Sequence, residues 1–337
     1  MPEKKKVILD VDTGSDDAVA IMSAVLCDEL EVLGIIATFG NQPLKYTLPN
    51  TLQVVELLKS KVPVYRGFGV PIAKDLTPGR SVNTDVTSLE RVIDGKMVAV
   101  HEKELPLPAT TIHEQPEHAV LWMLRTLKET REKITIIPVG PMTNIAAVLR
   151  MDPSVAENIE EVVCMGGGVY VHNITPCAEI NFYNDPEAAK ILLNSGVPVT
   201  IVTLDATHSS WFGYEEADQI AAVGNPPALF AANLLRHRIS SANQLGVRGQ
   251  QKSALHDVLA VCAVIDKSIL TDLRHEKCDV DIGGSYADGA LIVDHGSAAK
   301  PQLPTFIAYK ADAAKLLSML CKHLSNMHQE NSLRTFP

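Results

Sequence analysis

Residues 7–17, VILDVDTGSDD, constrain this chain more than any other stretch, because they crowd four carboxylates between two apolar segments. Residues 7–9 predict a buried strand and residues 18–26 a buried helix, with Gly14 in the turn between them. The acids of this turn are Asp10, Asp12, Asp16 and Asp17. Like charges and burial both raise the pKa of a carboxyl group, so a folded site needs a strong counter-charge here. A hard divalent cation would supply it.

This turn lies where α/β proteins bind their ligands, just beyond the carboxyl end of a strand. The simplest interpretation is an acidic helix start, in which Asp16 and Asp17 only interact favourably with the positive end of the helix dipole. That interpretation leaves Asp10 and Asp12 unexplained. A second interpretation is an oxygen-ligated Mg²⁺ or Ca²⁺ site that activates water. An EF-hand is excluded, since Gly14 and the residue after it stand where its fifth ligand and its glycine belong.

A third interpretation is a phosphatase of the haloacid dehalogenase type, whose nucleophile motif resembles residues 10–13. Such an enzyme also needs a downstream lysine and a later acidic pair for Mg²⁺. Lys133 and Asp272 are present, but neither stands in a clear match to those motifs.

The composition argues against several classes of partner. The chain has 337 residues, 46% of them hydrophobic, and a formal net charge of −10. An acidic protein is not expected to bind nucleic acid or an anionic membrane surface. No apolar signal region and no apolar run of about 18 residues occurs, which predicts a cytoplasmic protein. The six cysteines lack metal-binding spacing, so we expect reduced thiols without disulfides.

Strand and helix patterns alternate along the chain, beginning with a strand at 31–38, a helix at 52–58 and a strand at 62–65. Such alternation predicts an α/β fold with an open, mostly parallel, Rossmann-like sheet and helices on both faces. We expect one domain over residues 1–326, followed by a polar tail at 327–337. Residues 71–115 show no sustained period and are either an excursion over the site or an exposed loop.

Six blocks of sequence occur in the same order in a known family, and the chain resembles the inosine-uridine-preferring nucleoside hydrolases. The blocks are LDVDTGSDDA at 9–18, TFGN at 38–41, PVGPMTNIA at 138–146, VVCMGGG at 162–168, AEINFYNDPEAA at 178–189 and LHDVLAV at 255–261. The resemblance implies a calcium-dependent hydrolase that cuts the N-glycosidic bond of a ribonucleoside. It also implies a homodimer or homotetramer.

The resemblance assigns roles to individual positions. The implied Ca²⁺ ligands are Asp12, Asp17, the Thr143 carbonyl and Asp257, with Asp10 close behind. Asp12 would also be the general base, and His256 would protonate the departing base. The implied ribose contacts are Asp16 and Asn181 at the 2′ and 3′ hydroxyls, Asn173 and Glu179 at the 5′ hydroxyl, and Asn41 and Met165 along the ribose site.

The chain departs from the family pattern at the base end of the pocket. The usual His-Gly motif is absent; His101 is one candidate remnant and Asp94-Gly95 is another. The expected tyrosines before His256 are also absent. Polar side chains there could read the base instead: Asn243, Gln244 or Arg248. Recognition of the nucleobase by hydrogen bonds favours one defined base over broad tolerance. We expect a preference for purine nucleosides such as inosine and guanosine.

A catalytically silent relative is the remaining alternative. It would bind calcium and ribose-like ligands as a sensor or scaffold. Asp12 and His256 are both retained, which argues against lost catalysis.

Overall fold

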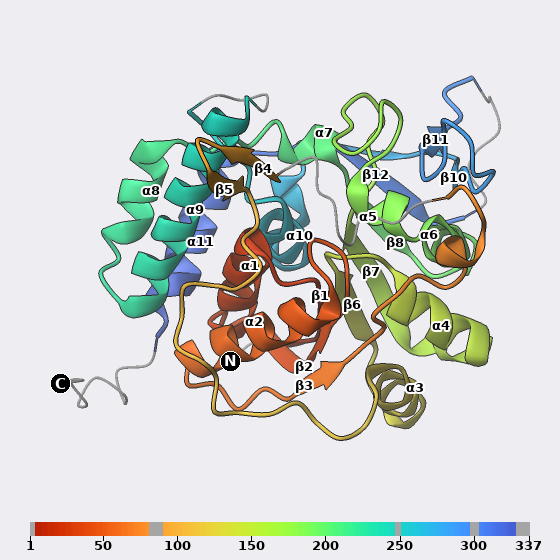
Figure 1. Cartoon of the computed structure of the whole chain (residues 1–337). Coiled ribbons are helices and arrows are strands. Elements are labelled where there is room, and N and C mark those ends of the chain that lie inside the picture. Colours follow the sequence, from red (N-terminus) through yellow and green to blue (C-terminus); the bar gives the residue numbers. More distant parts are fainter. Residues whose placement is uncertain (1–3, 81–89, 247–250, 297–302, 328–337) are drawn as a thin grey trace.

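The computed structural model describes residues 4–80, 90–246, 251–296 and 303–327. Within these ranges one large sheet forms the centre of the molecule (Figure 1). Its strands, in spatial order, are β3 (Val64–Arg66), β2 (Leu30–Ala37), β1 (Lys5–Val11), β6 (Ile134–Pro138), β7 (Ile159–Met165), β8 (Val199–Val202), β12 (Thr305–Lys310) and β9 (Asp272–His275). Neighbouring strands are parallel except at the edge, where β9 runs antiparallel to β12. The expected mostly parallel α/β sheet is confirmed.

Helices cover both faces of this sheet. Alternate side chains of β1 point to opposite faces: Val7 and Leu9 join one hydrophobic core, whereas Ile8 joins the other. The first core is closed by α1 (Ser15–Val25), α2 (Leu44–Leu57), α8 (Tyr214–Ala221), α9 (Pro226–Leu245), α10 (His256–Ile265) and α11 (Ala313–Ser325). The second is closed by α3 (Ala119–Glu129), α4 (Thr143–Met151) and α6 (Pro186–Leu193). A central strand with both faces covered must be apolar throughout, as residues 7–9 are.

Shorter elements connect the layers. The remaining helices are α5 (Ile180–Asn184), α7 (Leu204–Thr207) and the 3-10 turns Lys74–Leu76, Pro153–Asn158 and Lys267–Ile269. Two hairpins lie outside the main sheet: β4 (Glu90–Ile93) with β5 (Lys96–Ala99), and β10 (Cys278–Val280) with β11 (Leu291–Val293). No helix of the described ranges is long and apolar enough to cross a membrane.

The strand order reverses at β1, which has β2 on one side and β6 on the other. Connections leaving two such strands diverge to opposite faces and open a crevice at their carboxyl ends, where ligands of open α/β sheets bind. Asp10 pairs in register with Pro138 of β6, and Val139 N donates to the Asp10 carbonyl at 2.8 Å. The sheet therefore brings the acids after β1 beside residues 139–143.

Residues 213–245 have a helical pattern and form two helices, because Asn225 caps a new helix at Pro226; its side chain accepts a hydrogen bond from Ala228 N at 3.0 Å. In the region 71–115, Asp94 and Gly95 are exposed and have φ angles of 49° and 75°. They form the turn of the β4–β5 hairpin and not a site motif. Residues 328–337 of the expected tail lie outside the described ranges.

The buried side chain of Asp185 accepts hydrogen bonds from three segments of the chain. Its side chain caps α6 by accepting from Ala188 N at 3.1 Å. It also accepts from the Thr143 hydroxyl at 2.7 Å and from Ile72 N at 2.9 Å. A buried carboxylate with three donors fixes the start of α4, the start of α6 and the chain after β3 in one arrangement.

We expect Asp185→Ala to lower the free energy of unfolding by about 2–4 kcal/mol, because it removes a cap and leaves two buried donors without their acceptor. Asp312→Ala is the matched control, since Asp312 is exposed and caps α11 through its bond to Lys315 N at 3.0 Å. Its loss should cost about 1 kcal/mol. Chemical denaturation measures both values, and equal losses would contradict the linking role of Asp185.

Candidate active site

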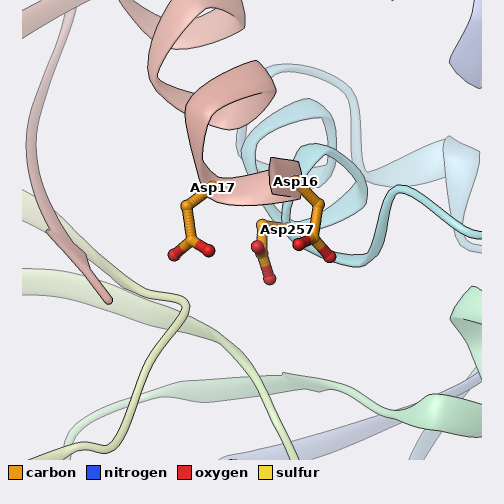
Figure 2. A group of neighbouring side chains, drawn as sticks. All are labelled: Asp16, Asp17 and Asp257. Carbon is orange, nitrogen blue, oxygen red and sulfur yellow. The ribbon is translucent and has the colours of Figure 1, made fainter. Parts of the chain in front are cut away.

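Buried acids from two helix starts converge at the crevice. Asp16 and Asp17 lie in the first turn of α1, and Asp257 lies in the first turn of α10. Figure 2 shows the three carboxylates directed to the same side. One oxygen from each lies within 4.8 Å of the other two. This spacing is compatible with oxygen ligands around one cation.

Asp12 reaches the same place from the end of β1. Its backbone N donates to Asp17 Oδ1 at 3.1 Å, and Gly14 N donates to Asp17 Oδ2 at 3.0 Å, so Asp17 closes the turn between strand and helix. Two glycines let the loops after β2 and β6 approach the Asp12 carboxylate. A Cβ atom at Gly40 would lie 2.1 Å from Asp12 Oδ2, and one at Gly140 would lie 2.8 Å from Oδ1.

Asn41 orients both acids. Its backbone N donates to Asp12 Oδ2, and its side-chain amide donates to Asp17 Oδ2 at 3.1 Å. Asp12 Oδ1 is buried without a hydrogen-bond partner among the described residues. An unpaired buried carboxylate oxygen is costly, so this atom indicates a ligand that the polypeptide itself does not supply.

The acids differ in how their charge is compensated. Burial raises the pKa of Asp17 to about 6, and burial together with neighbouring acids raises the pKa of Asp12 and Asp257 well above the usual range. Burial alone would also raise the pKa of Asp16, but the Arg238 guanidinium beside it holds that pKa below its ordinary value. Asp16 thus has its counter-charge, whereas Asp12, Asp17 and Asp257 need one.

Arg238 is a site residue that the sequence analysis missed. It lies on α9, is 2% exposed, and its Nη1 contacts Asp16 Oδ1 at 2.7 Å and Ser15 Oγ at 2.9 Å. A signal was available in the sequence. Position 238 falls on the helix face shared by Leu235 and Ala242, which are buried, and a charged residue on a buried face needs a partner.

His101 also lies in the site. Its Nδ1 accepts from Ser15 N at 3.4 Å and lies 3.7 Å from Asp16 Oδ1. A Cβ atom at Gly14 would lie 2.3 Å from Nδ1, so the glycine makes room for this ring. Burial lowers the pKa of His101 to about 4. Part of the region 71–115 therefore reaches the site, which the sequence had left open.

Further polar residues lie in the segment that follows β7. Asn181 donates its side-chain amide to the carbonyls of Val139, at 2.7 Å, and Met165, at 3.1 Å. Glu179 Oε2 accepts from Gly167 N at 2.8 Å and caps α5, while Oε1 is buried without a partner among the described residues. Asn173 Oδ1 accepts from Ile180 N at 3.0 Å within the same loop.

Asp10 and Thr143 are the remaining implied ligands. Asn144 donates its side-chain amide to both oxygens of Asp10, at 3.0 and 3.1 Å, and burial raises the pKa of Asp10 to about 8. Asp10 thus has its own partner behind the cluster. Thr143 is fully buried at the start of α4, with its hydroxyl on Asp185.

The base end is built differently from the expectation. Asn243 Oδ1 accepts from Gln251 N at 2.6 Å, Gln244 is exposed and donates to Ser240, and Arg248 lies outside the described ranges. Rings gather around His256 instead. Its Nδ1 lies 2.8 Å from the Thr207 hydroxyl, and the His208 ring centre lies 5.7 Å from its own and 4.6 Å from that of Trp211.

Comparison with known proteins decides the family. A model of the inosine-uridine preferring nucleoside hydrolases matches residues 7–318. The chain is a member of this family. It is 34% identical, over 86% of its length and 88% of the relative's, to the pyrimidine-specific ribonucleoside hydrolase RihA of Escherichia fergusonii. RihA of Escherichia coli K12 shows the same identity and coverage.

Solved structures agree on the fold of this nucleoside hydrolase. The purine-preferring ribonucleoside hydrolase from Gardnerella vaginalis superposes with a TM-score of 0.81 at 28% identity, over 96% of this chain and 99% of its own. A plant nucleoside hydrolase superposes with a TM-score of 0.82 at 22% identity, over 96% and 99%. Membership of this family argues against a phosphatase, and Lys133 is exposed at the amino end of β6, whereas the acids follow the carboxyl end of the parallel strand β1.

Glu179 yields a pH-dependent prediction. Burial raises its pKa to about 7 from an ordinary 4.5, so its contribution to stability is present below pH 4.5 and is lost as the pH rises through 7. Glu179→Gln carries no such proton and keeps an oxygen for Gly167 N. We expect the stability of this variant relative to wild type to increase by about 2–3 kcal/mol between pH 5 and pH 8.

Urea denaturation at the two pH values measures this change. Glu216→Gln is the control, because Glu216 also accepts a backbone hydrogen bond, from Gly213 N, but is only half-buried. A difference between Glu179→Gln and wild type that stays constant with pH would rule out a buried, proton-binding carboxyl group.

Proposed function

We propose that this nucleoside hydrolase cleaves the N-glycosidic bond of pyrimidine ribonucleosides with the help of a bound Ca²⁺ ion, releasing ribose and the free base. The observation that carries the proposal is Asp12 Oδ1, which is buried without a hydrogen-bond partner among the described residues, next to the clustered carboxylates of Asp16, Asp17 and Asp257. Asp12, Asp17 and Asp257 are the acids of this cluster that have no counter-charge among the residues the structure describes. Together with the Thr143 carbonyl they would form an all-oxygen donor set, which suits Ca²⁺.

The chain's own residues would position the reactants. Asp12, Asp17 and Asp257 would hold a calcium ion, which would supply positive charge next to the attacking water and make that water more acidic. Asp12 takes the proton from that water, with its other oxygen held by Asn41 N. Asp16 and Asn181 hold the ribose 2′ and 3′ hydroxyls. The positive charge that develops on the ribosyl group is stabilised by the surrounding carboxylates.

The ribose 5′ end would be held by the loop after β7. Glu179 Oε1 is the buried acceptor without a partner there, so the 5′ hydroxyl can donate to it. Asn173 lies in the same loop and Met165 at the end of β7, and both would line this end of the site.

His256 would assist departure of the base. The Thr207 hydroxyl holds its Nδ1, and we propose that Nε2 faces the base. Burial lowers the pKa of His256 to about 3, so the ring is neutral in the free enzyme near pH 7. The neutral ring would therefore assist by donating its Nε2–H as a hydrogen bond to the base as negative charge develops there, and the base would take its proton from solvent.

The specificity of the named relatives supports pyrimidine nucleosides, and the structure weakens one residue on which the purine expectation rested. The expected preference for inosine and guanosine rested on Asn243, Gln244 and Arg248, and the Asn243 oxygen is already bonded to Gln251 N. The relatives at 34% identity over most of the chain are pyrimidine-specific. The purine-preferring relative from Gardnerella vaginalis is less similar, at 28% identity.

Ribose release from a panel of uridine, cytidine, inosine, guanosine and adenosine tests the proposal. We expect uridine and cytidine to give the highest kcat/KM, and removal of the cation by a chelator to abolish turnover until calcium is restored. Asp12→Ala should lower kcat by at least about 10³-fold, since it removes the base and a ligand. Faster turnover of inosine and guanosine would reinstate the purine preference. No turnover of any nucleoside would favour the silent relative.

His256→Ala separates leaving-group assistance from folding. We expect kcat for uridine to fall about 10²–10³-fold, because the departing base then lacks the hydrogen bond from His256 that stabilises its developing negative charge. Hydrolysis of p-nitrophenyl riboside should fall less than about tenfold, since nitrophenolate leaves without a proton. His113→Ala, at an exposed histidine, is the control. Equal losses for both substrates would refute the assisting role.

A further inference from the structure

Arg238 places a buried positive charge next to the acidic cluster, where we propose that a divalent metal ion binds. Burying a guanidinium is costly, and its repulsion of a nearby divalent ion would weaken metal binding. Among the described residues, its ion pair with Asp16 is the one Lys or Arg contact to the acids of the cluster. A purely structural need could be met by an apolar side chain at lower cost. The charge therefore calls for a role in the site.

The contacts of Arg238 fix one side of Asp16. Nη1 donates to Asp16 Oδ1 at 2.7 Å, while Nε donates to Ser253 Oγ at 3.3 Å, so the guanidinium is held at two of its nitrogens. Ser15 Oγ and His101 Nε2 lie 2.9 and 3.3 Å from Nη1. The arginine thus joins α9, the start of α1, the segment before α10 and the histidine after β5 around a single carboxylate.

This arrangement divides the acids into two groups. Within the part of the chain that the structure describes, Asp12, Asp17 and Asp257 have no basic partner and are the acids proposed to hold the metal, whereas Asp16 has one oxygen committed to Arg238. A carboxylate held by one oxygen can present its other oxygen in a single direction. Such an acceptor makes a directed hydrogen bond to one substrate hydroxyl and is left unpaired and buried when that hydroxyl is missing.

We propose that Arg238 is a positioning residue that directs Asp16 toward a ribose hydroxyl and thereby sets the discrimination between ribonucleosides and deoxyribonucleosides. This inference rests on the proposed function, in which Asp16 contacts the 2′ or 3′ hydroxyl. Sites built to bond a substrate hydroxyl reject the analogue without it by about 10⁴-fold. Much of that rejection depends on the acceptor being unable to turn away, which is what Arg238 provides.

The test compares kcat/KM for uridine with that for 2′-deoxyuridine and 3′-deoxyuridine. We expect Arg238→Met to lower kcat/KM for uridine about 100-fold, because Asp16 is no longer held in place. The already slow hydrolysis of at least one deoxy analogue should change less than tenfold. The ratio of kcat/KM for uridine to kcat/KM for that analogue then decreases at least about tenfold. Arg238→Lys keeps the positive charge but lacks the planar guanidinium with its several N–H donors, so it should give an intermediate ratio of kcat/KM between uridine and the deoxy analogue.

Arg236→Met is the matched control. Arg236 lies on the same helix and also forms an ion pair, with Asp218 at 2.6 Å, but on the exposed surface. We expect it to keep the wild-type ratio. Ser253→Ala removes only the contact that holds Nε and should shift the ratio in the same direction, so the proposal remains testable if the Arg238 variants fold poorly.

The possible outcomes test the role of Arg238 separately from the proposed nucleoside hydrolase activity. A wild-type enzyme that hydrolyses no nucleoside would overturn the proposed function. A wild-type enzyme that is active and discriminates, while Arg238→Met or Ser253→Ala lowers kcat/KM for all three substrates equally, would overturn the role of Arg238. A contracted ratio in these variants, with Arg236→Met unchanged, would support it.

Discussion

Mutual repulsion among buried carboxylates is the constraint on which the rest of this site depends. Five aspartates meet where β1 ends, and each needs a way to tolerate its neighbours. Asp10 is held by the Asn144 amide, and burial raises its pKa to about 8. Asp16 is paired with Arg238. The remaining three share no protein cation within the described residues, so a bound metal ion completes the charge balance in our proposal.

The fold makes this crowding possible by geometry alone. The reversal of strand order at β1 opens the crevice, and Gly40 and Gly140 let two loops close on the Asp12 carboxylate. The acids of α1 and α10 lie in first turns, where unpaired backbone N–H groups favour negative charge. Part of the repulsion is therefore offset before any metal binds. The strand order, the two glycines and the helix starts are all properties of the backbone, and they are largely independent of the side chains around the substrate.

That independence explains which parts of the site were predictable from sequence. Asp12 and Asp17 sit at strand and helix ends whose periodic patterns are strong, so their position followed from local rules. Arg238 lies on the apolar face of its helix, which indicates burial, but its partner Asp16 lies more than two hundred residues away in the chain, so no local rule predicts their ion pair. His101 follows a hairpin in a segment without a hydrophobic period, and only the tertiary structure brings it to Gly14. The antiparallel edge strand β9 is polar and partly exposed, and its sequence did not predict a strand.

The same distinction separates the two ends of the proposed pocket. The sugar end is built from residues that follow β1, β6 and β7, whose register is fixed by a sheet buried on both faces. The base end is built from α7, α9 and the segment before α10, where Trp211, Asn243 and Gln251 lie. Helices and loops can exchange such side chains without disturbing the sheet. Arg238 belongs to the base-end helix yet acts on a sugar-end carboxylate, so substitutions along α9 can alter sugar selectivity as well as base preference.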